Sequence, residues 1–327
     1  MKILFIYYKK MGSFVRKDWE ILKKRHETKV VRFSTILDAY AIWKGTRWCD
    51  LTFSWFGSLH SFFAVLFSKL RGKRSVVVAG GYDVVRLPEI KYGLFSFWWK
   101  RWCPLMVFRH ANLILTVSQN TTRETLSNAK VDARKIRLLY HGFNADIYKP
   151  QSNQNKQPIV LSVGGISRAT LARKGLELFV KSSKFLREIE FVLVGKWIDD
   201  SINYLRSIAS PNMKFLGEVD EFALLTLMSK SKVYVQVSRH EGFGCSLAEA
   251  MLFECIPVVA NVAAIPEVVG DCGFFLTDQS PEKLAALISR ALNSDSKLGK
   301  KARERIENLF PIAKRQNRLL ELIEDLE

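Results

Sequence analysis

Short, continuous apolar runs that alternate with helical patterns constrain the fold of this chain more than any other feature. The first run is Lys2–Tyr8, and an amphipathic helix is expected after it, from about Phe14 to Arg25. Strands that are apolar throughout are typical of a parallel sheet covered by helices on both faces, which predicts the α/β class. The expected strands of the first half are Lys2–Tyr8, Val30–Phe33, Leu51–Trp55, Ser75–Ala79, Leu113–Val117 and Ile136–Tyr140.

The same alternation starts again after a polar stretch, residues 151–158, which has no periodicity and is predicted to be an interdomain linker. A chain of 327 residues is also about the right length for two α/β units. We therefore expect two doubly wound domains, residues 1–150 and residues 159–308. The second set of expected strands is Ile159–Val163, Phe191–Val194, Met213–Leu216, Val233–Val237, Pro257–Ala260 and Gly273–Leu276.

The net charge of +18 is concentrated in the first half of the chain. Residues 1–150 hold 27 Lys and Arg against 10 Asp and Glu, whereas residues 151–327 hold 23 against 22. A one-sided excess of this size indicates an anionic partner, such as a phosphorylated substrate, lipid head groups or nucleic acid.

The sequence predicts a cytoplasmic protein. The apolar run Ile3–Tyr8 is too short for a signal peptide, and two lysines follow it. No apolar stretch approaches the ~20 residues of a membrane-spanning helix. The five cysteines form no C-x-x-C pair and fit reduced thiols in a reducing compartment.

The run from Glu241 to Met251 carries the strongest chemical signal. Glu241 follows an expected strand, two glycines come next, and a helix then holds Glu249. Glycine lets the backbone approach a ligand, and the N-terminus of a helix binds phosphate. The pattern predicts an anion-binding turn flanked by two carboxylates, with a tight structural turn as the alternative.

The spacing of Glu241 and Glu249 resembles the E-x7-E signature of the retaining GT-B glycosyltransferases of family GT4, which includes the phosphatidylinositol mannosyltransferases. Residues 256–269 resemble the P-V-(V/I)-x4-G-x-x-E region of that family, although Ala263-Ala264-Ile265 replaces its glycine-bearing turn. The resemblance implies the GT-B fold, two Rossmann-like domains that face each other across a cleft. It also implies that 159–308 binds the nucleotide-sugar donor, and that the last helix, within 309–327, returns to an acceptor-binding first domain.

The resemblance also assigns roles to single residues of the motif. Glu241 would bind hydroxyls of the donor sugar, and Glu249 would bind the ribose. The backbone N–H groups of Phe243, Gly244 and Cys245 would contact sugar and diphosphate.

The segment Gly164–Gly175 follows an expected strand and is predicted to be a loop; it resembles the G-R-x5-K-G segment whose Arg and Lys hold the donor diphosphate. Arg168 and Lys174 occupy those two positions, and Ser167 replaces the glycine before the Arg. Fixed cations stabilise the charge that grows on a diphosphate leaving group without a metal. We therefore expect no metal and no cofactor; a solvated surface is the alternative role of the two cations.

Two further sets of residues are predicted from the same resemblance. Lys196 follows a strand end, and Leu216 and Val219 lie in an F-L-G-x-V segment, so these three are expected near the nucleotide base. In the first domain, Gly12 and Ser13 form the first strand-to-helix loop, which would lie against the diphosphate or the acceptor; a purely structural turn is the alternative.

Gly80-Gly81-Tyr82-Asp83 resembles the family's H-G-x-D segment, with Gly80 in place of the His. Tyr82 is assigned to the acceptor side, and Asp83 is predicted to orient the acceptor or accept its proton. A capping or turn role is the alternative for Asp83.

The segment 91–109 is dense in aromatic residues and flanked by cations. Aromatic residues favour the membrane interface, and Lys and Arg meet anionic head groups. We predict that the first domain docks on the inner face of a membrane and takes a lipid-linked acceptor; the alternative is that these aromatics are core.

The predicted function is that of a retaining hexosyltransferase that moves a sugar from a UDP- or GDP-sugar to an acceptor. Two alternatives stay open. One is a nucleotide-sugar epimerase or sugar phosphorylase on the same fold, and the other is a basic nucleic-acid-binding protein. No nucleic-acid-binding motif is found, so nucleic acid is not an expected partner.

Overall fold

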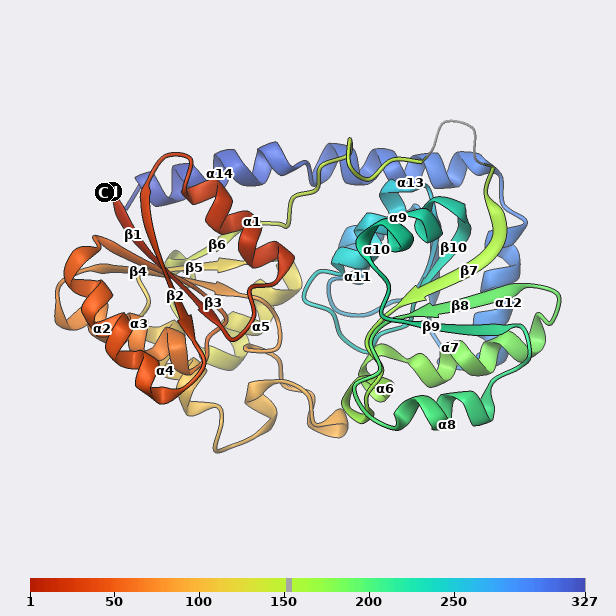
Figure 1. Ribbon diagram of the computed structural model, residues 1–327, viewed down its shortest axis with the longest axis horizontal. Coiled ribbons are helices and arrows are strands. Elements are labelled where there is room, and N and C mark those ends of the chain that lie inside the picture. The colour runs from red at the N-terminus through yellow and green to blue at the C-terminus, as the bar shows by residue number, and fades with distance from the viewer. Residues whose placement is uncertain (151–154, 327) are drawn as a thin grey trace. The chain divides into compact units, whose positions relative to one another are not determined.

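The computed structural model describes residues 1–150 and 155–326, which form two compact units (Figure 1). Unit 1 comprises Met1–Gly142 and Ile312–Glu327, and unit 2 comprises Phe143–Pro311. Each unit has one six-stranded sheet in which every pair of neighbouring strands runs parallel. The predicted class, two doubly wound parallel sheets, is confirmed.

In unit 1 the strand order is β2-β1-β3-β4-β5-β6, so the chain changes direction along the sheet between β1 and β3. Every residue of β3 is buried, as expected of a strand covered on both faces. The elements are β1 (Lys2–Tyr8), α1 (Ser13–Leu22), β2 (Glu27–Phe33), α2 (Ala39–Trp48), β3 (Leu51–Trp55), α3 (Leu59–Leu70), β4 (Arg74–Ala79), α4 (Trp102–His110), β5 (Leu113–Thr116), α5 (Gln119–Ala129), β6 (Ile136–Leu138) and α14 (Ile312–Glu324), with 3-10 turns at Ile36–Asp38, Pro88–Ile90, Leu94–Ser96 and Ala133–Lys135.

Unit 2 repeats this plan with the strand order β12-β11-β10-β7-β8-β9. Its core packs Phe179 against Phe191, a helix residue on a strand residue, with ring centroids 5.5 Å apart. The elements are β7 (Gln157–Val163), α6 (Arg168–Lys174), α7 (Leu176–Ser182), a 3-10 turn (Ser183–Phe185), β8 (Glu190–Val194), α8 (Ser201–Ile208), β9 (Met213–Gly217), α9 (Glu221–Lys230), β10 (Ser231–Gln236), α10 (Cys245–Leu252), β11 (Ile256–Ala260), α11 (Ile265–Val269), β12 (Phe274–Leu276), α12 (Pro281–Leu292) and α13 (Ser296–Leu309).

The division between the units falls at Gly142 and Phe143, before the predicted end of the first domain at residue 150. Phe143 stacks on Phe243 with ring centroids 6.0 Å apart, and the Arg303 guanidinium donates to the carbonyl of Tyr148 at 2.8 Å. These contacts hold residues 143–150 in unit 2. Of the predicted linker 151–158, residues 151–154 lie outside the described residues, and 157 and 158 already belong to β7.

A buried ion pair fastens α14 to α1, and the two helices lie side by side in Figure 1. The Arg315 guanidinium donates to both carboxylate oxygens of Asp18, at 2.7 and 2.8 Å. It also donates to the carbonyls of Leu139 and Tyr140, and the Trp55 indole N–H donates to Asp18 at 3.1 Å. Arg315 is only 3% exposed, and a buried charge that loses its partner is destabilising, so we expect this pair to matter for the stability of unit 1.

Candidate active site

The sheet of unit 2 has a switch point between β7 and β10. β8 and β9 extend the sheet on one side of β7, and the chain then returns to place β10 on the other side. In open α/β sheets, ligands bind outside the carboxyl ends of the strands at such a point. Gly164 directly follows β7, and Glu241 follows β10 by a few residues, so both predicted donor-binding segments start here.

Glu241 and two cations form a compact charged cluster at this point. The Lys174 ammonium lies 2.9 Å from the Glu241 carboxylate, the Arg173 guanidinium lies 3.6 Å from it, and the Ser238 hydroxyl donates to it at 2.9 Å. Burial by itself raises the pKa of Glu241, but the charges of Lys174 and Arg173 outweigh it and hold that pKa below its ordinary value. The cluster therefore combines an ionised acid with two cations, and its net charge is positive.

Gly175 places these cations next to β10. Its φ of 64° is in the left-handed region, and a Cβ atom there would lie 2.3 Å from the Val237 carbonyl oxygen. The Arg239 N–H donates to the Arg173 carbonyl at 2.7 Å, which ties the end of α6 to the segment after β10. The predicted loop from Gly164 to Gly175 is therefore wrong in part, because residues 168–174 form a helix capped by Ser167.

Arg168 lies outside the charged cluster. It is the exposed first residue of α6, six positions before Lys174, which is about 9 Å along a helix axis. Its N–H donates to the Asp199 carboxylate at 2.9 Å. Arg173, which the motif comparison did not select, lies beside Glu241 instead; the only sequence signal for it is a second cation next to Lys174.

The glycine turn leads directly into α10, the helix that the sequence predicted to hold Glu249. Gly244 occupies the N-cap position with φ 102°, and no side chain caps the helix that starts at Cys245. The buried Phe243 ring packs edge-on against Phe310 with centroids 5.2 Å apart, and this contact anchors the turn. A helix N-terminus of this kind presents backbone N–H groups and the positive end of the helix dipole.

Glu249 lies in the second turn of α10, where it contacts the hydroxyl of Tyr148. Burial raises the pKa of Tyr148 first, and the nearby Glu249 carboxylate raises it further. The sequence did not suggest this partner, because 101 positions separate the two residues.

The residues predicted to lie near the base are at the ends of β8 and β9. Lys196 is mostly exposed, and its ammonium lies 3.8 Å from the Glu218 carboxylate. Leu216 is exposed and Val219 is half-buried. The neighbouring Trp197 ring lies 4.6 Å from the Arg206 guanidinium, so an aromatic surface is also present at this edge.

In unit 1, Asp83 has the turn role that was the alternative in the sequence analysis. One carboxylate oxygen accepts the N–H of Gly57 at 2.7 Å, and the other accepts those of Gly80 and Gly81 at 3.1 and 3.0 Å. Burial raises the pKa of Asp83 to about 6 although these three N–H groups act against it. A role of Asp83 toward the acceptor stays a prediction.

The other acceptor-side residues of unit 1 are more accessible. Gly12 is the N-cap of α1 with an ordinary extended backbone, and Ser13 is the exposed first residue of that helix. Tyr82 is half-exposed, with its ring 5.2 Å from that of Tyr92. The place that a side chain at Gly80 would take is filled by the ring of Phe56.

Residues 1–150 and 155–326 contain neither a candidate metal site nor a candidate membrane span. No group of three His, Cys, Asp or Glu side chains there could hold a metal ion, and metal independence stays a prediction. None of the helices in those ranges has both the length and the apolar character that a membrane span requires.

A family model described as "Glycosyl transferases group 1" matches residues 144–309, just over half of the chain. The chain belongs to this family. The match covers the charged cluster, the glycine turn and α10 of this glycosyl transferases group 1 member. The comparisons give no support to the epimerase or nucleic-acid alternatives.

Two curated relatives of this group 1 member are mannosyltransferases. A stretch of 208 residues is 27% identical to O-antigen chain mannosyltransferase B of Escherichia coli, and covers 57% of this chain and 53% of that protein. A stretch of 252 residues is 25% identical to MMP alpha-(1->4)-mannosyltransferase of Mycolicibacterium hassiacum, and it covers 70% of this chain and 60% of that protein. The matches thus span between about half and three fifths of these relatives.

The solved structure of HepE from Anabaena, in complex with UDP and glucose, resembles the whole group 1 member. The TM-score is 0.81 with 18% identity, over 99% of both chains. At this identity the likeness concerns the fold, and it confirms the predicted GT-B class of two Rossmann-like units.

Proposed function

We propose that this protein is a retaining hexosyltransferase that moves a sugar, with mannose as the first candidate, from a UDP- or GDP-sugar to a glycan or lipid-linked acceptor. The observation that carries the proposal is the cluster of Lys174, Arg173 and Glu241 at the switch point of unit 2. The names of the two mannosyltransferase relatives support the choice of sugar, and the UDP bound in HepE supports a nucleotide donor.

In the proposed reaction, the donor diphosphate meets Lys174 and Arg173 and the N-terminus of α10. Negative charge grows on the diphosphate as the glycosidic bond breaks, and cations held in place stabilise it. Glu241 keeps both cations in position and, because it is ionised, accepts hydrogen bonds from hydroxyls of the transferred sugar. Glu249 accepts hydrogen bonds from the ribose, and Arg168 adds a third cation from the start of α6.

The proposal is tested by offering UDP-, GDP- and ADP-sugars and measuring free nucleoside diphosphate with and without a glycan acceptor. We expect one nucleotide to bind more tightly than the others in calorimetric titration, by about tenfold or more. EDTA should leave turnover unchanged, and the one-bond C1–H1 coupling of the transferred sugar, which reports its anomeric configuration, should be of the same class in product and donor. Absence of nucleotide binding would refute the proposal, while an inverted product would remove only its stereochemical part.

We also propose that unit 1 docks on an anionic membrane surface, and this proposal rests on an exposed surface of unit 1. Trp98 is 75% exposed and Trp99 is 53% exposed, and Lys100 and Arg101 follow them directly. The predicted aromatic segment is therefore not simply core, although Phe95 within it is buried. Indole rings beside cations are suited to an interface with anionic head groups.

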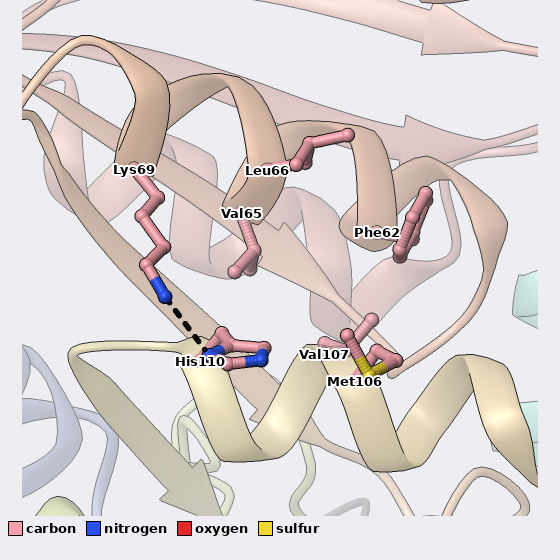
Figure 2. A pocket seen from close by; sticks show the side chains of 7 residues that line it. All are labelled: Phe62, Val65, Leu66, Lys69, Met106, Val107 and His110. Carbon is pink, nitrogen blue, oxygen red and sulfur yellow. Dashed lines mark hydrogen bonds between the residues drawn. The ribbon is translucent and has the colours of Figure 1, made fainter.

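An apolar hollow of about 120 Å³ lies between α3 and α4, and most of α4 belongs to the segment 91–109. Figure 2 shows the side chains that line this hollow. Leu66 and Met106 line it, and Lys69 and His110 close one end, with their nitrogens 3.3 Å apart. Burial, and then the charges of Lys69, Lys135 and Arg109, lower the pKa of His110. The surface around the hollow is therefore electropositive, which favours anionic lipid.

The protein is expected to sediment with vesicles that contain anionic lipid and not with neutral ones, because Lys and Arg side chains are attracted to anionic head groups. The double variant Trp98→Ser/Trp99→Ser should lose most of the bound fraction. Phe222→Ser, which removes an exposed ring from unit 2, serves as the control and should bind normally. Equal sedimentation with both kinds of vesicle, or with neither, would contradict the prediction.

A further inference from the structure

Unit 1 contains a pocket of about 500 Å³ whose place in the sheet matches that of the charged cluster in unit 2. Tyr8 ends β1 and Phe33 ends β2, while Phe56 and Asp83 follow β3 and β4. The pocket thus lies at the carboxyl ends of the strands where the order reverses between β1 and β3. Its volume is in the range of small-molecule sites, ~300–1,000 Å³.

Phe56, one of the residues that line this pocket, has an unusual backbone conformation. The backbone of Phe56 has φ 68°, which is rare for a bulky residue and persists only where neighbouring groups enforce it. The Phe56 N–H donates to the Val78 carbonyl at 2.8 Å, and the Ser61 hydroxyl donates to the Phe56 carbonyl at 2.6 Å. A Cβ at Gly80 would lie 2.2 Å from the ring, so only glycine at position 80 leaves room for it.

The pocket contains no cation, although unit 1 carries almost the whole positive charge of the protein. None of its lining residues, all of them among the described residues, is Lys or Arg. His60 is neutral at pH 7, since burial lowers its pKa to about 4, and its Nε2 lies 2.7 Å from the Trp55 carbonyl. Asp83 uses both oxygens on backbone N–H groups. The Lys9 ammonium lies 5.2 Å from the centroid of the Tyr8 ring but is not part of the lining, so an anionic group inside the pocket would have no lining cation to balance its charge.

The lining instead combines aromatic rings with hydroxyl groups. Tyr8 and Tyr82 are half-exposed and carry phenolic hydroxyls, and Ser34 and Ser58 add aliphatic ones. A hexopyranose ring has apolar C–H faces that pack on aromatic rings and hydroxyls that need hydrogen-bond partners. We propose that this pocket binds an uncharged hexopyranose of the acceptor and selects against a phosphorylated one. The inference rests on the proposed function, for which it names the acceptor class.

The test uses the whole protein and saturation-transfer NMR with methyl α-pyranosides of mannose, glucose and galactose, each compared with its 6-phosphate. At least one neutral glycoside is expected to bind about tenfold more tightly than its phosphate. Tyr82→Ala should weaken that binding about tenfold, and Tyr82→Phe should keep most of it because the ring remains. Tyr40→Ala, which removes an exposed ring elsewhere in unit 1, is the matched control.

A second variant tests the charge argument directly. Ile36 is an exposed residue of the lining, and Ile36→Lys adds the cation that the pocket lacks. The 6-phosphate should then bind about tenfold more tightly than it does to the unchanged protein.

Three results would overturn the inference: no neutral glycoside binds, the phosphate binds more tightly to the unchanged protein, or Tyr82→Ala binds the glycoside normally. Nucleotide titration of the same samples distinguishes failure of the acceptor inference from failure of the proposed function. If a nucleotide binds and no glycoside does, the acceptor inference fails alone; if no nucleotide binds, the proposed function fails as well.

Discussion

Lys174→Ala is expected to lower kcat/KM for the nucleotide-sugar donor by about 10²–10³-fold, the usual cost of removing one preorganised group that meets charge developing in a transition state. The ammonium of Lys174 lies 2.9 Å from Glu241, so the change removes a diphosphate contact and also loosens the sugar-binding carboxylate. The pKa of Glu241 should rise, because one of the two charges that lower it is gone. The acid limb of the pH–rate profile should therefore move to higher pH.

Lys184→Ala is the matched control, because Lys184 is an exposed lysine of unit 2 outside the cluster. Arg173→Ala and Arg168→Ala test which arginine contributes more to turnover, because the structure and the family motif point to different ones. The structure predicts the larger loss for Arg173, which lies 3.6 Å from Glu241, and the motif predicts it for Arg168. Normal turnover of a folded Lys174→Ala protein would contradict the proposed role of the cluster.

Arg315→Ala is expected to lower the free energy of unfolding of unit 1 by about 3–5 kcal/mol, the cost of leaving a buried charge without its partner. After this change the Asp18 carboxylate keeps the Trp55 indole N–H as a donor but loses the guanidinium, and the carbonyls of Leu139 and Tyr140 lose it as well. Denaturant unfolding followed by tryptophan fluorescence measures this effect well. Seven of the eight tryptophans, all but Trp197, belong to unit 1.

Arg318→Ala on the same helix is the control, since Arg318 pairs with Glu321 at the surface and such pairs contribute about 0–1 kcal/mol. Asp18→Leu/Arg315→Met should cost less than either single change, because removing both charges leaves neither one unpaired. A loss in Arg315→Ala no greater than in Arg318→Ala would show that the buried pair is not needed for the stability of unit 1.

The strand pattern was predictable because it is local. A strand buried on both faces must be apolar along its whole length, and this property can be read from single segments such as Leu51–Trp55, which β3 matches to the residue. The glycine turn before α10 was predictable for a similar reason, since Gly244 needs a backbone conformation that other residues rarely adopt. The predicted loop at Arg168 was wrong because Ser167 and Thr170 form a capping box that starts a helix there.

By itself, then, the sequence determined the two parallel sheets, the order of their elements and the segments that reach the carboxyl ends of the strands. Only the tertiary structure decided which side chains meet: Arg173 beside Glu241, Arg315 on Asp18, and the ring of Phe56 in the space beside Gly80. The physical reason is the distance along the chain between the residues that determine each feature. Backbone conformation and burial pattern depend on neighbours in the chain, whereas an ion pair such as that between residues 18 and 315 exists only after packing has brought distant segments together.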